Sequence, residues 1–117
     1  MDWVQYETMR LVSGGEGIFD RIATETTSIG DIPIFKGTTL NVINRTCFYD
    51  DAYFENAKDF RPERWENPSQ EAFNMLMMGF STGPRTCIGK HLALIESKIA
   101  AIKFIQRYDN LEEKFEP

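Results

Sequence analysis

The chain has few of the residues that build metal clusters or disulfide frameworks. Its two cysteines, Cys47 and Cys87, are far apart and form no C-x-x-C pair, and His91 is the only histidine. Zinc sites and disulfide frameworks require several such residues at short spacing, so the sequence indicates neither. A single bridge between Cys47 and Cys87 stays open on the sequence alone.

Positive charge is also scarce. The chain carries 13 lysines and arginines against 18 aspartates and glutamates, for a net charge of −5, and no basic stripe is present. Nucleic acids and anionic membrane surfaces attract proteins with an excess of positive charge. We therefore expect no nucleic-acid partner.

Long apolar runs and targeting signals are missing as well. No run reaches the length of a membrane span, and the first residues lack the basic and apolar regions of a signal peptide. The glycine-rich segment 13–17 is expected to end a helix in a loop, but it lacks the lysine and hydroxyl residue of a phosphate loop. We therefore expect a soluble chain as written, with one modest core that forms one domain or part of one.

The most informative stretch that is present runs from residue 79 to residue 92. It is a glycine- and proline-containing loop that carries one cysteine, Cys87, and leads into an apolar stripe. Gly83 and Gly89 permit positive φ or close approach of a flat partner, and Pro84 stiffens the bend. The apolar residues then recur at intervals of three and four, which predicts an amphipathic helix over Ile88, Leu92, Ile95, Ile99, Ile102 and Ile105.

This arrangement makes Cys87 a candidate metal ligand. At the start of a helix, unpaired N–H groups and the helix dipole stabilise an anion, and a thiolate is the form of cysteine that binds metals. Arg85 adds a positive neighbour or a donor for a ligand carboxylate. The alternative is a buried structural cysteine in an ordinary turn, since free cysteine is often core.

The remaining segments predict a mixed but mainly helical chain. Residues 1–11 have a helical pattern, with Glu7 and Arg10 on one face. Residues 22–44 predict a small antiparallel sheet of short strands at 24–29, 32–35 and 38–43, separated by turns at 30–31 and 36–37. Residues 66–78 are interpreted as a linker that ends in a methionine cluster of adaptable core.

Three motifs then occur in a fixed order. They are Glu7-x-x-Arg10, Phe60-x-Pro62-Glu63-Arg64-Trp65 and Phe80-x-x-Gly83-x-Arg85-x-Cys87-x-Gly89. The last resembles the haem-binding loop of the cytochrome P-450 family, the haem-thiolate monooxygenases, and the first two resemble segments that precede that loop in the family. The chain departs from the family pattern where it has Phe35 and Gly79 for common prolines, and Ser81 for a frequent glycine.

The resemblance implies a fold and a set of site residues. The fold is mainly α with a small antiparallel β region, and residues 1–117 form a partial cytochrome P-450 domain, the C-terminal portion. Cys87 is expected to be the axial thiolate ligand of haem iron, with Arg21 and Arg85 at the haem propionates. The expected cofactor-binding residues are Arg21, Phe80, Gly83, Arg85, Cys87, Ile88 and Gly89, and a buried ion triad joins Glu7, Arg10 and Arg64.

The resemblance also implies a function. The complete protein is expected to insert one oxygen atom of O2 into a small apolar organic substrate, with electrons from a reductase. The segments that form the oxygen face precede the region matched here, so we expect this chain alone not to turn over. Anchored eukaryotic members suggest the endoplasmic reticulum membrane, through an N-terminal anchor absent from this chain. The alternative is a truncated, non-catalytic remnant or an interaction module with a structural cysteine.

Overall fold

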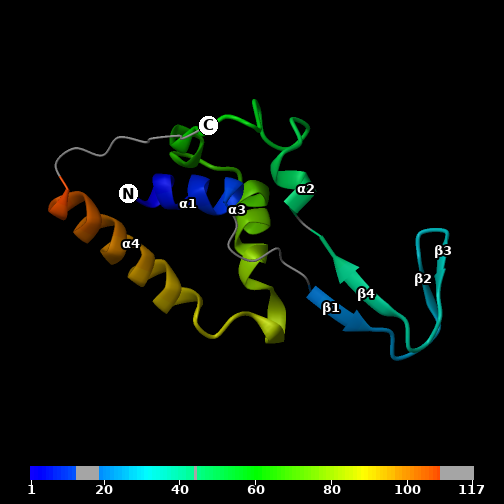
Figure 1. Ribbon diagram of the computed structural model, residues 1–117. Helices are drawn as coiled ribbons and strands as arrows, with labels where there is room; N and C mark the ends of the chain where they lie inside the picture. The colour runs from blue at the N-terminus through cyan, green and yellow to red at the C-terminus, as the bar shows by residue number, and fades with distance from the viewer. Residues whose placement is uncertain (13–18, 44, 109–117) are drawn as a thin grey trace, which may run out of the picture.

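The computed structural model describes residues 1–12, 19–43 and 45–108, so the loop expected at 13–17 lies outside the described residues. Helices dominate, and small antiparallel sheets project from them (Figure 1). This is the mainly α architecture with a small β region that the sequence predicts. Its elements are α1 (Asp2–Leu11), β1 (Phe19–Ile22), β2 (Thr27–Ile29), β3 (Ile32–Ile34), β4 (Thr39–Val42), α2 (Arg45–Phe48), the 3₁₀-helix η1 (Pro62–Trp65), α3 (Gln70–Met77), the 3₁₀-helices η2 (Met78–Phe80) and η3 (Gly83–Arg85), and α4 (Lys90–Arg107).

The β region consists of two separate two-stranded ribbons in the described residues. Strand β1 pairs with β4 so that Arg21 lies opposite Leu40, and β2 pairs with β3 around a turn in which Gly30 adopts a φ of 56°. The sequence pattern did not predict β1, because its partner follows only after the whole β2–β3 hairpin. Figure 1 shows this hairpin extending away from the helices.

The interpretation of residues 66–78 as a linker is wrong, because most of this segment forms α3. The Ser69 hydroxyl caps the helix by accepting a hydrogen bond of 3.1 Å from the backbone N–H of Ala72. A serine at this position satisfies one of the unpaired N–H groups of the first turn. Leu76 is fully buried, and Met75 and Met77 pack beside it, so the methionines belong to the core as expected.

The core lies where α1, α2, η1 and α3 meet. Tyr6 of α1 packs edge to face against Trp65, at 5.9 Å between ring centroids, and against Phe73 of α3, at 5.7 Å. Such edge-to-face pairs add to the free energy gained by burying the rings. The buried members of the cluster are Phe48, Phe54, Ala57, Trp65 and Leu76. The first helix is therefore joined through Trp65 to the segment that leads into the cysteine loop.

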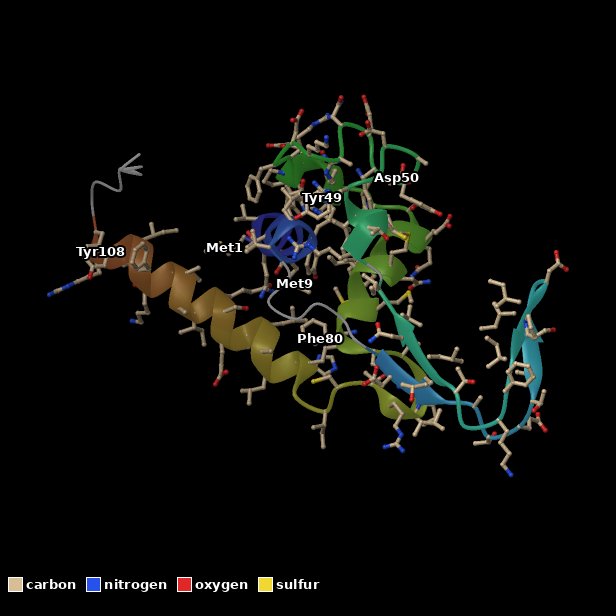
Figure 2. All side chains as sticks on the ribbon, turned by 45° about the vertical axis from the view of Figure 1, so that its right-hand side comes forward. Met1, Met9, Tyr49, Asp50, Phe80 and Tyr108 are labelled. Carbon is tan, nitrogen blue, oxygen red and sulfur yellow. The ribbon has the colours of Figure 1, made fainter. Side chains whose placement is uncertain are left out.

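Helix α4 begins two residues later than the apolar pattern predicts, at Lys90, with Gly89 as its N-cap residue. Its contact with the rest of the molecule runs along α1, where the Gln5 amide donates to the Leu94 carbonyl at 2.9 Å and Lys98 pairs with Asp2. Figure 2 shows α4 running away from the other helices toward Tyr108. The apolar stripe that predicted this helix is exposed along its length. No helix among the described residues has the length and apolar composition that a bilayer span needs.

Candidate functional site

One buried ion pair organises the centre of the molecule. Glu7 and Arg10, one turn apart on α1, are both completely buried, and Arg10 donates two hydrogen bonds to the Glu7 carboxylate, at 2.8 and 3.0 Å. The other guanidinium donors of Arg10 reach the carbonyls of Phe48, Ala57 and Asp59. All five N–H donors of this arginine are thus used, which is what allows the charge to be buried.

Arg64 and Trp65 of η1 complete the environment of Glu7. Arg64 Nε donates to Glu7 Oε1 at 2.9 Å, and the Trp65 indole N–H donates to Glu7 Oε2 at 2.8 Å. The backbone N–H of Arg61 adds a third donor from this segment, at 2.9 Å. One carboxylate on α1 therefore binds the N-cap residue of η1 and its last two residues, and the expected set of Glu7, Arg10 and Arg64 lies together in the structure.

The donors around Glu7 outweigh the effect of burial on its ionisation. Burial alone would raise the pKa of this carboxyl, but hydrogen bonds from Arg10, the Arg61 backbone, Trp65 and Arg64 lower it, and the resulting pKa is about 2. Hydrogen bonds to the charged form of a carboxylate favour that form. Glu7 is therefore an anion over the whole physiological pH range.

The two arginines also hold a segment that has little regular structure. Arg64 donates to the carbonyls of Glu55, Asn56 and Asp59, and Arg10 binds the carbonyls of Ala57 and Asp59 in the same segment. The Ala57 carbonyl is buried and needs a donor, which Arg10 supplies, whereas the carbonyls that Arg64 binds are exposed. The ion network therefore sets the path of the chain from α2 into η1 and α3, and α3 leads directly to the cysteine loop.

The cysteine loop is closed by hydrogen bonds within the backbone. The N–H of Cys87 donates to the carbonyl of Phe80 at 2.7 Å, and the N–H of Thr86 donates to the carbonyl of Gly83 at 3.1 Å. Gly83 has a φ of 65°, a value that favours glycine over other residues. The loop thus folds back on itself, and the backbone of Cys87 lies beside that of Phe80.

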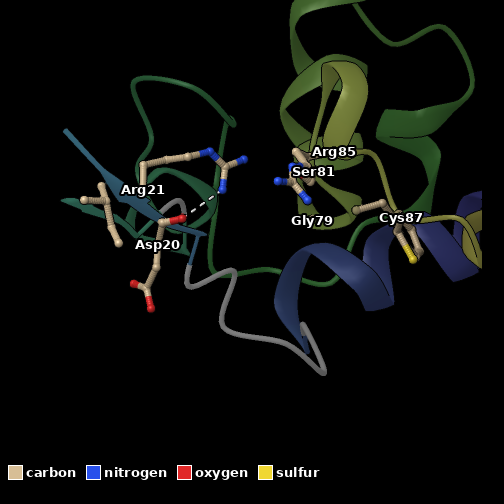
Figure 3. Close-up of a pocket in the computed structure, with 8 residues that line it drawn as sticks. Asp20, Arg21, Gly79, Ser81, Arg85 and Cys87 are labelled. Atoms are coloured by element: carbon tan, nitrogen blue, oxygen red, sulfur yellow. Dashed lines mark hydrogen bonds between the residues drawn. The ribbon is translucent and has the colours of Figure 1, made fainter. Parts of the chain in front are cut away.

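A concave surface beside this loop encloses a volume of about 660 Å³. It lies between the loop and strand β1, and it is lined by Asp20, Arg21, Ile22, Gly79, Phe80, Ser81, Arg85 and Cys87. Figure 3 shows the guanidinium groups of Arg21 and Arg85 extending into the space between the strand and the loop. Arg21 also donates to the carbonyl of Asp20 at 2.9 Å, the bond drawn as a dashed line.

The expected cofactor residues fall into two groups. Arg21, Phe80, Arg85 and Cys87 line the concave surface together, although Arg21 lies far from the others in the sequence. Gly83, Ile88 and Gly89 do not line it: Gly83 shapes the loop, Gly89 caps α4, and Ile88 is fully exposed.

The position of Cys87 differs from the expectation in one respect. The thiol is exposed and free, but it precedes the N-cap Gly89 by two residues instead of standing at the start of the helix. A turn separates them, in which the N–H of Lys90 donates to the Cys87 carbonyl at 3.3 Å. Cys47 is also free, so the disulfide bridge left open by the sequence is not formed.

Sequence reasoning missed several residues of the site. Asp20 and Ile22 join it because they flank Arg21 on a strand that the pattern did not predict, and Gly79 and Ser81 were noted only as departures in the loop. The hydrogen bond from Trp65 to Glu7 could have been suspected from the sequence. A tryptophan in the core needs an acceptor for its indole N–H, and Glu7 was already expected to be buried.

The groups on the concave surface include one thiol, one aromatic ring and two guanidinium groups. Among the residues described, no group of three or more His, Cys, Asp or Glu side chains is placed to hold a metal by protein ligands alone. His91 is exposed on α4 and does not line the concave surface. One sulfur donor, one aromatic ring and two guanidinium groups instead suit a metal whose other ligands come from a carboxylate-bearing macrocycle.

Comparisons with known proteins identify what this chain is similar to. The sequence model of the family described as Cytochrome P-450 matches residues 1–116. Putative cytochrome P-450 CYP13A3 of Caenorhabditis elegans is 34% identical over 99% of this chain and 22% of its own length, and cytochrome P-450 3A13 of Mus musculus is 33% identical over 92% of this chain and 22% of its own length.

Structure comparison points the same way. The solved structure of "cytochrome P-450 CREJ" superposes with a TM-score of 0.69 and 25% identity over 89% of this chain and 24% of that one. The chain therefore spans between a fifth and a quarter of the length of the proteins that it matches.

Proposed function

Because this chain belongs to the cytochrome P-450 family, we propose that it is the haem-binding part of a haem-thiolate monooxygenase, with Cys87 as the axial ligand of the iron. The observation that carries the proposal is the shared concave surface: Cys87 lines it with Phe80, Arg85 and the sequence-distant Arg21. Residues 1–117 then form one part of a larger cytochrome P-450 domain.

The residues present fit haem by their chemistry. Haem supplies four ligands to its own iron and carries two carboxylates, so a protein site for it needs one axial donor and cationic groups at the edge. Cys87 is an exposed free thiol, and Arg21 and Arg85 are two exposed guanidinium groups on the same surface. Guanidinium pairs with carboxylate through two parallel hydrogen bonds.

Each of these residues has a distinct task in the proposal. Cys87 holds the iron through its sulfur, and the loop bond to the Phe80 carbonyl keeps its backbone in place. Phe80, which is half-buried, places an aromatic ring in the same surface and limits access of water to the sulfur. Arg21 and Arg85 bind and orient the two carboxylates. When bound, haem with a thiolate ligand supplies the chemistry of O2 activation.

The complete protein would use this site to oxidise an organic substrate. We propose a small apolar substrate and an electron-donating reductase as partners, and a location at the endoplasmic reticulum membrane. The supporting similarity is that to animal members of the family, including the mouse protein. This chain contributes the ligand, the carboxylate-binding groups and the ion network beneath them.

The rival function, a non-catalytic module with a structural cysteine, is disfavoured by one observation. A structural cysteine is expected inside packed side chains, whereas the Cys87 thiol is exposed on a concave surface. This exposure supports the proposed role of Cys87 as a ligand.

Reconstitution with haem tests the proposed function. We expect the 117-residue chain, loaded with haem, reduced and exposed to CO, to give the red-shifted Soret band of a thiolate-ligated haem. Cys87→Ser should abolish this band, and Cys47→Ser should keep it. A band that survives Cys87→Ser would show that Cys87 is not the ligand, and no band from the unmodified chain would contradict haem binding by this chain.

A further inference from the structure

Ser81 has a backbone conformation that belongs to glycine. Its φ is 64° and its ψ is 178°, and this region of conformational space is occupied almost exclusively by glycine, because a Cβ meets the neighbouring peptide groups there. Gly83, two residues on, has a φ of 65° and carries no such penalty. Ser81 is therefore the strained residue of the cysteine loop.

Two hydrogen bonds hold the strained conformation in place. The peptide group between Phe80 and Ser81 donates its N–H to the Met78 carbonyl at 2.8 Å, and its carbonyl accepts the Cys87 N–H at 2.7 Å. The N–H and the carbonyl of this one peptide group are thus both hydrogen-bonded. The group therefore cannot rotate to relieve the backbone strain at Ser81 without breaking the bond to Cys87. Strained conformations persist in proteins only where the surroundings determine them in this way.

We propose that Ser81 is a positioning residue for Cys87, because its strain decides how firmly the Phe80–Ser81 peptide holds the backbone of the cysteine. The inference rests on the proposed function of Cys87 as haem ligand. In the held state, the Cys87 N–H is bonded and the thiol lines the concave surface with Ser81 and Phe80. Rotation of the peptide relieves Ser81 and releases Cys87, so the strain favours the released state.

Hydrogen exchange measures this opening directly, without haem. Ser81→Gly removes the Cβ and is expected to slow exchange of the Cys87 amide by about tenfold, since the held state no longer carries the strain. Ser81→Ala is the matched variant: it keeps the Cβ and loses the hydroxyl, and should leave exchange within about twofold of the unmodified chain. The Phe73 amide in α3, bonded to the Ser69 carbonyl at 3.0 Å, should not change in either variant.

Three results would overturn the inference. If Ser81→Gly does not slow exchange at Cys87, the held state is not strained. If Ser81→Ala slows it as much as Ser81→Gly, the hydroxyl and not the backbone is responsible. If the Phe73 amide slows by the same factor as Cys87, the glycine stabilises the whole chain and not the loop.

Haem titration of the same variants separates the inference from the proposed function. We expect Ser81→Gly to bind haem more tightly than the unmodified chain and Ser81→Ala to bind it equally, with the thiolate Soret signature in all three. Equal affinity of Ser81→Gly and the unmodified chain would overturn the link between the strain and the ligand. Absence of haem binding in every variant would overturn the proposed function, while the exchange data would still decide whether Ser81 is strained.

Discussion

The indole N–H of Trp65 donates a hydrogen bond of 2.8 Å to Oε2 of Glu7, across 58 positions of sequence. The carboxylate thereby binds Trp65 in addition to Arg10 and Arg64, and the ring that carries the donor also packs against Tyr6 of α1. Trp65 therefore joins the ion network to the apolar core. A change at this residue affects both, and the two contributions can be separated by experiment.

Trp65→Phe should lower the free energy of unfolding by about 1–3 kcal/mol, because Glu7 loses a donor while an aromatic ring remains in the core. Urea unfolding of the chain measures the change. Trp3→Phe is the control, since Trp3 is 40% exposed. Equal effects of the two substitutions would mean that the bond to Glu7 contributes nothing.

Acid should unfold the chain as Glu7 takes up a proton. The pKa of Glu7 is about 2 in the folded chain, below its ordinary value of 4.5, so its contribution to stability is complete above pH 4.5 and is lost as the pH falls toward 2. Full protonation of Glu7 should lower the free energy of unfolding by about 3 kcal/mol. Unfolding free energies between pH 6 and pH 2, with an NMR titration of the Glu7 carboxyl, measure it. A Glu7 carboxyl that titrates near 4.5 would contradict the prediction.

Arg64→Ala should destabilise the chain by about 3–5 kcal/mol, because it leaves the buried Glu7 with one cation fewer and removes the donors to three loop carbonyls. Lys103→Ala, on the exposed surface of α4, is the control. The soluble yield and the urea concentration at the unfolding midpoint should both fall for Arg64→Ala and stay unchanged for Lys103→Ala. Similar yields and similar unfolding midpoints for the two variants would show that Arg64 is dispensable.

If Arg21 and Arg85 bind the haem carboxylates as proposed, Arg21→Gln and Arg85→Gln should each weaken haem binding by about tenfold, because each removes one charge-assisted pair. Arg107→Gln, at the far end of α4, removes the same charge away from the concave surface and should have no effect. Haem titration followed by the Soret band measures all three variants. A loss confined to Arg85→Gln would exclude Arg21 from the site.

Short-range patterns predicted much of the candidate site. The cysteine loop could be recognised because its glycines, proline and arginine stand at fixed short distances from Cys87. Glu7 and Arg10 could be paired because they stand one helical turn apart, and the structure buries both. In each case the chemistry depends on neighbours within a few residues, which a sequence displays directly.

Long-range pairing limited the rest. Strand β1 exists because β4 lies beside it, and the concave surface exists because β1 brings Arg21 to the cysteine loop. The segment read as a linker is a helix because Ser69 caps it and Leu76 is buried against residues from other elements. The strained conformation of Ser81 is held by two hydrogen bonds of the Phe80–Ser81 peptide group, one to Met78 before it and one to Cys87 after it in the sequence. The strand pairing and the burial of Leu76 depend on residues far away in the sequence. The Ser69 cap and the bonds around Ser81 are local, but their geometry is not displayed by the pattern of residue types.

The sequence by itself determined which side chains this protein offers: one loop thiol, its flanking arginine and glycines, and a carboxylate with two arginines able to neutralise it. Only the tertiary structure decided which of them meet. Burial in the core brought Trp65 to Glu7, and strand pairing brought Arg21 to the concave surface that Cys87 also lines. The physical reason is that hydrogen bonds and packing act over a few ångströms of space, whatever the separation along the chain.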